Sequence, residues 1–262
     1  MNKIVCWIFL VLATLMLAAC GGGGSASSSS PPPPSPVNVQ GLWSGTYSIQ
    51  GGTQNVELIG MIMQGGDAVF YDPNGISYIL PPFSGGATVS GTMAAFPESG
   101  TTLPNGQIQE SFTVNGSVST ASIAGTFSNA SESGTVSVTP FTPTFTGTPT
   151  IVAGQWQGSY EGGMQTAVDI TVQANGSFSG SDAFGCQLSG TVTQVGTANL
   201  FTVSANSVAL AGSGSQCLGS VHGLAYESSV DEFGTAGSAK GTYYYADVFN
   251  AMGAVVVEFY MP

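Results

Sequence analysis

Basic side chains are almost absent from this chain. Lys3 and Lys240 are the only two among 262 residues, whereas 14 residues are acidic. Because contacts to phosphate groups need Lys and Arg, this composition excludes nucleic-acid binding. It also argues against electrostatic attachment to anionic lipid head groups. Charged residues of both signs make up only 6% of the chain, so membrane attachment would have to come from another feature.

Residue patterns that could support catalysis by histidine or metal binding by cysteine are also scarce. His222 is the only histidine, and no pair of cysteines has the spacing of a zinc site. A Ser-His pair would have to use His222, and the chain lacks the G-x-S-x-G nucleophile elbow. We therefore expect no catalytic residue, no metal and no cofactor. Paired carboxylates remain an alternative route to hydrolysis, although none of the 14 acidic residues lies in a recognisable catalytic motif.

The amino terminus has the three parts of a secretory signal. Lys3 provides a short basic region, residues 4–17 are almost all apolar, and small residues follow at Ala18 and Ala19. The apolar run is short for a membrane span, which needs about 20 residues. An ordinary signal peptide with an incidental cysteine is the alternative to the interpretation that follows.

Leu17-Ala18-Ala19-Cys20 resembles the lipobox of bacterial lipoproteins. The resemblance implies cleavage before Cys20, a diacylglycerol thioether on Cys20, and acylation, such as palmitate, of the new amino terminus. Since Gly21 rather than Asp follows Cys20, it also implies the outer membrane of a Gram-negative cell. We expect a lipid-anchored protein on the periplasmic face or the cell surface, held by the lipid on Cys20.

A flexible linker and an internal repeat organise the rest of the chain. Residues 21–36 read GGGGSASSSSPPPPSP, which cannot bury a core. The pattern G-x-W-x-G-[ST]-Y occurs at residues 41–47 and again at 154–160, and a Pro/Thr-rich stretch lies between the two copies. We predict five segments: a signal peptide 1–19, the lipidated Cys with its linker 20–37, a first β module 38–140, a connector 141–150 and a second β module 151–262.

Strand patterns dominate both modules. Apolar residues alternate with polar ones at Val168, Ile170 and Val172, as in a half-buried strand. The sequence predicts turns at residues 72–75, at Asn115-Gly116 and at Asn175-Gly176. Short strands separated by glycine-containing turns predict an all-β fold of two antiparallel barrels or sandwiches of about eight strands each. At most one helical turn is expected, near residues 228–233.

The opening G-x-W of each module resembles the first strand of lipocalin-type barrels, whose Trp plugs the base of the barrel. Cys6 lies in the signal peptide and Cys20 is the predicted lipid site, so Cys186 and Cys217 are left as a pair. In an exported protein we expect them to form a disulfide.

These features favour a non-enzymatic outer-membrane lipoprotein with a binding, envelope or adhesion role, whose ligand would be a protein or a glycan. The order of signal peptide, linker and β modules resembles that of Gly/Ser/Pro-tethered lipoproteins of Gram-negative bacteria. It also loosely resembles surface lipoproteins with paired barrels, such as the transferrin-binding and complement-factor-binding types. The alternatives are a carboxylate-using hydrolase, a lipocalin-like carrier of a small apolar ligand, and a transmembrane barrel.

Overall fold

The computed structural model describes residues 37–83, 87–97, 102–103, 105–160, 167–210, 217–229, 242–250 and 253–261. The predicted lipobox with Cys20, the linker to residue 36 and most of the predicted helical turn lie outside these ranges. The described chain is all-β, as the sequence predicts. Within it, no helix is long and apolar enough to cross a membrane.

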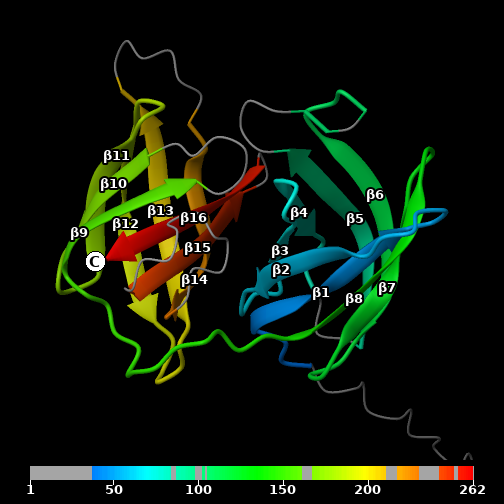
Figure 1. Cartoon of the computed structure of the whole chain (residues 1–262), viewed down its shortest axis with the longest axis horizontal. Helices are drawn as coiled ribbons and strands as arrows, with labels where there is room; N and C mark the ends of the chain where they lie inside the picture. Colours follow the sequence, from blue (N-terminus) through cyan, green and yellow to red (C-terminus); the bar gives the residue numbers. More distant parts are fainter. Residues whose placement is uncertain are drawn as a thin grey trace, which may run out of the picture. The chain divides into compact units, whose positions relative to one another are not determined.

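The first repeat forms a closed barrel of eight antiparallel strands (Figure 1, blue to green). Each strand pairs with the next, and β1 also pairs with β8, which closes the barrel. The strands are β1 (Gly41–Ile49), β2 (Val56–Ile62), β3 (Ala68–Tyr71), β4 (Ile76–Leu80), β5 (Thr88–Pro97), β6 (Glu110–Val118), β7 (Ile123–Ser128) and β8 (Ser133–Pro140).

The second repeat forms another closed barrel in which β9 pairs with both β10 and β16. Its strands are β9 (Gly154–Tyr160), β10 (Ala167–Val172), β11 (Ser177–Asp182), β12 (Cys186–Gln194), β13 (Phe201–Ala209), β14 (Gly219–Ser228), β15 (Thr242–Asn250) and β16 (Gly253–Met261). The alternation predicted for Val168, Ile170 and Val172 is confirmed, because all three are buried in β10 between exposed neighbours.

The core of the first barrel follows from the same period of two, because alternate side chains of a strand point to opposite faces. In β6, Phe112 and Val114 are buried and Thr113 between them is exposed. Trp43 joins this core from β1 and is only 3% exposed. Its indole N–H donates a hydrogen bond of 2.9 Å to the carbonyl oxygen of Val39, which ties the segment entering β1 to the barrel.

Two of the predicted turns are confirmed and one is wrong. Residues 72–75 connect β3 to β4, and Asn175-Gly176 connects β10 to β11. Asn115-Gly116 instead lies inside β6, where Gly116 is directly opposite Gly125 of β7. A Cβ atom on Gly116 would lie 2.6 Å from the carbonyl oxygen of Ala124. This glycine therefore permits a close approach of two strands rather than a turn.

The predicted disulfide is present. Cys186, the first residue of β12, is bonded to Cys217, which precedes β14, and their Cα atoms lie 5.9 Å apart. The bond closes a loop across β12 and β13, with a sequence separation of 31 residues. It cross-links the second barrel only.

Candidate functional site

The two ends of the first barrel differ in character. Strands of alternating direction place the β1–β2, β3–β4, β5–β6 and β7–β8 connections at one end, which we call the polar end because it carries Asp72, Glu110 and Glu132. The opposite end, called the Trp43 end, receives the segment that contains Val39 and is filled by buried apolar side chains. The interior of the barrel between these ends is the candidate site.

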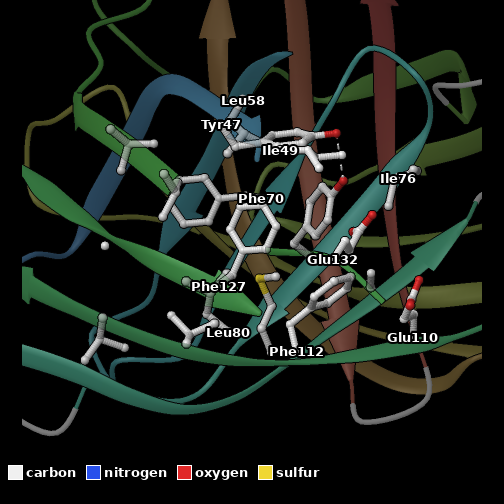
Figure 2. A pocket seen from close by; sticks show the side chains of 18 of the residues that line it. Tyr47, Ile49, Leu58, Phe70, Ile76, Leu80, Glu110, Phe112, Phe127 and Glu132 are labelled. Carbon is white, nitrogen blue, oxygen red and sulfur yellow. Dashed lines mark hydrogen bonds between the residues drawn. The ribbon is translucent and has the colours of Figure 1, made fainter. Parts of the chain in front are cut away.

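A cavity of about 210 Å³ lies inside the first barrel. Its walls are mainly aliphatic and aromatic side chains contributed by all eight strands (Figure 2). An apolar protein cavity of roughly 150 Å³ is large enough to bind benzene. The cavity therefore has room for one small organic molecule.

Aromatic rings line the cavity in a connected series of edge-to-face contacts. The ring centroids of Tyr47 and Tyr78 lie 5.7 Å apart, with an interplanar angle of 65°. Tyr47 contacts Phe127 at 6.0 Å and 74°, and Phe127 contacts Phe112 at 5.7 Å and 88°. Edge-to-face pairs stabilise a packed core by about 0.5–1.5 kcal/mol each beyond the area they bury. This arrangement fixes the shape of one wall of the cavity.

A buried carboxylate holds two of these rings in place. Tyr47 and Tyr78 both donate to Oδ2 of Asp72, at 2.9 and 3.0 Å. Oδ1 of Asp72 accepts the backbone N–H groups of Asn74 and Ile76, at 2.9 and 3.1 Å. Asp72 is fully buried, and a buried charge needs such donors because it has lost its water.

Both phenols of this cluster remain protonated at neutral pH. Burial is the main cause, and it raises the pKa of Tyr47 and of Tyr78 well above the ordinary value of 10.0; the charge of Asp72 raises both further. Each phenol therefore keeps its proton and uses it in the hydrogen bonds within the cluster.

Two glutamates line the cavity at the polar end. Glu110 accepts hydrogen bonds from the side-chain amides of Asn105 and Asn129, at 2.9 and 2.6 Å. The side-chain oxygen of Asn129 accepts the backbone N–H groups of Ser131 and Glu132, both at 2.8 Å, which orders the β7–β8 turn. Burial, and then repulsion by Glu110, raises the pKa of Glu132 above its ordinary value. Figure 2 shows both carboxyl groups on the same side of the cavity.

The charge of the lining has one sign. Glu110 and Glu132 are the only charged residues among the described residues that line the cavity, which include no Lys, Arg or His. Lys240, the only Lys or Arg after Cys20, lies outside the described ranges. Nothing among the described lining residues can form an ion pair with an anionic ligand.

The repeated motif has the same structural roles in both barrels. The indole N–H of Trp156 donates to the carbonyl oxygen of Val152 at 2.8 Å, as Trp43 does to the carbonyl oxygen four residues before it. Tyr160, the last residue of the second copy, donates to Oδ2 of Asp182 at 2.8 Å. This bond corresponds to that of Tyr47 with Asp72.

A second shared motif, D-x-x-G, was missed in the sequence analysis. It occurs at residues 72–75, between β3 and β4, and at residues 182–185, which start at the last residue of β11 and lead to β12. Both glycines have positive φ angles, 81° at Gly75 and 88° at Gly185. Oδ1 of Asp182 accepts the backbone N–H of Cys186 at 2.9 Å, four residues on, as Oδ1 of Asp72 accepts that of Ile76. Matching the two repeats beyond the first strand would have revealed it.

The remaining sequence candidates do not gather into a site. His222 lies on β14 with an exposed side chain and is not part of the cavity lining. Within the described ranges, no three His, Cys, Asp or Glu side chains are placed to hold a metal ion. The cavity glutamates were not singled out from the sequence, because no motif marks them.

No family model, curated protein or solved structure matches this chain. Its function therefore has to be inferred from the cavity and the residues around it.

Proposed function

We propose that this protein binds a small apolar molecule inside its first barrel. The observation that carries the proposal is the cavity of about 210 Å³ with mainly apolar walls. Transfer of an apolar molecule from water into such a space is favourable by roughly 25 cal/mol for each Å² of apolar surface removed from water. Sites of this kind are mostly apolar and contain a few polar groups that orient the ligand. Here these groups are the carboxylates of Glu110 and Glu132 and the phenols of Tyr47 and Tyr78.

Close strand contacts and hydrogen bonds hold the walls of this cavity. Gly45 and Gly60 allow close contact between neighbouring strands, because a Cβ atom on either would overlap backbone atoms of the adjacent strand. The hydrogen bonds of Tyr47 and Tyr78 to the buried Asp72 fix the two rings on one wall. A preformed cavity lowers the entropy that binding has to overcome. This supports a lipocalin-like carrier role for the first barrel.

The proposal is tested by filling the cavity. Ala95 of β5 is 2% exposed and lines the cavity, whereas Thr92 of the same strand is exposed to solvent. We expect the wild type and Thr92→Phe to bind a neutral naphthalene derivative in isothermal titration calorimetry. Ala95→Phe should lose at least about tenfold in affinity, which corresponds to 1.4 kcal/mol. Equal binding by Ala95→Phe, with its fold intact by circular dichroism, would refute an interior site.

We also propose that the barrels are carried by an outer-membrane lipoprotein anchored through Cys20. The lipobox-like residues 17–20 and the linker at 21–36 support this location. The Cys186–Cys217 disulfide is what an oxidising, exported compartment allows. Metabolic labelling with an alkyne fatty acid should modify the wild type and leave Cys20→Ala unlabelled. Protease treatment of intact cells then separates surface display, in which the barrels are digested, from a periplasmic location, in which they are protected.

A carboxylate-dependent hydrolase is a second candidate, favoured by Glu110 and Glu132. The two carboxyls line one cavity in unequal surroundings: two amides hold Glu110, and the pKa of Glu132 is raised. Unequal acid pairs are the usual basis of acid-base hydrolysis. Turnover of chromogenic glycosides or esters that is abolished by Glu110→Gln and by Glu132→Gln would establish this function. Reversible binding without turnover supports the carrier.

A further inference from the structure

Resting on the proposed function of the first barrel, we infer that its ligand carries a protonated amine. The amine lies at the polar end beside Glu110 and Glu132, and the aromatic or aliphatic body of the ligand fills the apolar part of the cavity. The inference names the chemical class of the ligand, and it follows from the charges, hydrogen-bond capacity and ring arrangement of the described lining.

The first reason is electrostatic. The two glutamates supply all the charge of the described lining, and no basic side chain balances them. A fatty acid or another anionic amphiphile would place its carboxylate beside Glu110 and Glu132 without a positive partner. An ammonium group would be paired, and hydrogen bonds between ionised groups are about twice as strong as neutral ones.

The second reason is the direction of the hydrogen bonds. The phenol protons of Tyr47 and Tyr78 are already used within the cluster around Asp72. What these hydroxyls can still offer to a ligand is the lone pairs of their oxygen atoms, and ionised carboxylates are acceptors only. The polar atoms at this end therefore match a ligand group that donates several protons. An ammonium group donates three.

The third reason is the geometry of the polar end. Glu110 is fixed by Asn105 and Asn129, and its repulsion contributes to the raised pKa of Glu132. A cation beside the two carboxylates would relieve that repulsion, since an opposite charge favours the ionised form of a carboxyl. The rings of Phe112 and Phe127 line the same cavity, and aromatic faces attract cations.

The test compares three probes of nearly equal size with the full chain by isothermal titration calorimetry: naphthylmethylamine, naphthylmethanol and naphthoate. We expect the amine to bind more tightly than the alcohol by about tenfold or more, as a charge-assisted hydrogen bond produces. Naphthoate should bind most weakly. Glu110→Gln and Glu132→Gln should each lower the affinity for the amine more than the affinity for the alcohol, so that the preference for the amine falls. Circular dichroism verifies that each variant is folded.

Glu57→Gln is the matched control. Glu57 is an exposed acid on β2 that is not part of the cavity lining, so this variant should keep the full preference for the amine. Equal binding of amine and alcohol by the wild type would overturn the inference and leave the apolar carrier intact. The same conclusion holds if both cavity glutamine variants keep the preference. If none of the three probes binds, the proposed function itself fails.

Discussion

Tyr47 donates its hydroxyl proton to Oδ2 of Asp72 across 2.9 Å, and the bond links strand β1 to the turn between β3 and β4. Tyr160 and Asp182 form the corresponding bond between β9 and the β11–β12 turn. In both barrels the bond joins elements separated by an intervening strand. The last residue of the repeated G-x-W-x-G-[ST]-Y motif thus fastens one end of its barrel, which gives the repeat a structural role.

Removal of either hydroxyl should destabilise the protein. Tyr47→Phe and Tyr160→Phe keep the ring but lose a hydrogen bond to a carboxylate, so each should lower the free energy of unfolding by about 1.5–3 kcal/mol. Ser48→Ala is the control, because the hydroxyl of Ser48 forms a hydrogen bond at the exposed surface, with Thr135; it should change stability by less than about 0.5 kcal/mol. Urea denaturation measures all three. Phenylalanine variants no less stable than Ser48→Ala would contradict the role assigned to the motif.

The partly buried Tyr47 and Tyr78 predict a loss of stability at high pH. Burial, aided by the charge of Asp72, raises the pKa of Tyr47 and Tyr78 in the folded state above 10.0. Above pH 10 the unfolded chain therefore releases these protons before the folded chain does, and the free energy of unfolding falls as pH rises. The double variant Tyr47→Phe/Tyr78→Phe should show a shallower fall. Tyrosinate absorbance that reports ordinary titration of both residues in the folded protein would refute this expectation.

The glycine inside the repeated motif should tolerate no side chain. A Cβ atom on Gly45 would overlap the carbonyl oxygen of Ser137 on β8, and one on Gly158 would overlap that of Glu258 on β16. Gly45→Ala and Gly158→Ala should therefore cost about 1–3 kcal/mol or more, as overpacking does. Gly65→Ala is the control, because its nearest neighbour would be Oδ2 of Asp67 at 3.8 Å. Equal melting temperatures for the three variants would contradict this, because they would mean that neighbouring strands can move apart to accommodate the added methyl group.

The disulfide should stabilise the second barrel. The bond joins residues 31 apart and so restricts the conformations of the unfolded chain. This restriction should raise the free energy of unfolding by about 3–4 kcal/mol. Trp43 and Trp156 lie one in each barrel, and Trp7 is the third tryptophan of the chain. In a Trp7→Phe chain, a further Trp43→Phe substitution lets fluorescence follow the second barrel, and Trp156→Phe instead lets it follow the first. Cys186→Ser/Cys217→Ser should lower the midpoint reported by Trp156 and leave that reported by Trp43 unchanged. An equal loss in both would contradict independent unfolding of the two repeats.

The features that the sequence predicted correctly depend on the alternation of apolar and polar residues along a strand, or on assigning the cysteines their roles one by one. Alternation identified β10, and the roles assigned to Cys6 and Cys20 left Cys186 and Cys217 as the disulfide pair. Asn115-Gly116 was interpreted wrongly because a glycine required by a turn and one required by close strand contact look alike in a single sequence. Only the partner strand, with Gly125 opposite, distinguishes them.

The candidate site could not be predicted because it depends on closure of the barrel. Glu110 begins β6 and Glu132 precedes β8, and the antiparallel register brings them to the same end. Whether the inward side chains fill the interior depends on their total volume over all eight strands. Small residues such as Ala95 leave space. The hydrogen bond between Tyr47 and Asp72 did have a sequence signal, because the D-x-x-G pattern that contains Asp72 occurs again at residues 182–185.

Binding inside the first barrel is tested most directly by nuclear magnetic resonance of methyl-labelled methionines. Met93 lines the cavity, whereas Met61, also buried, is not part of its lining. On titration with naphthylmethanol we predict that the Met93 methyl resonance, assigned with Met93→Leu, shifts and shows nuclear Overhauser effects to the probe, and that Met61 shows no such effects. If the probe binds while Met93 remains unperturbed, or if no methionine responds at saturating probe, the first barrel does not bind its ligand in this cavity.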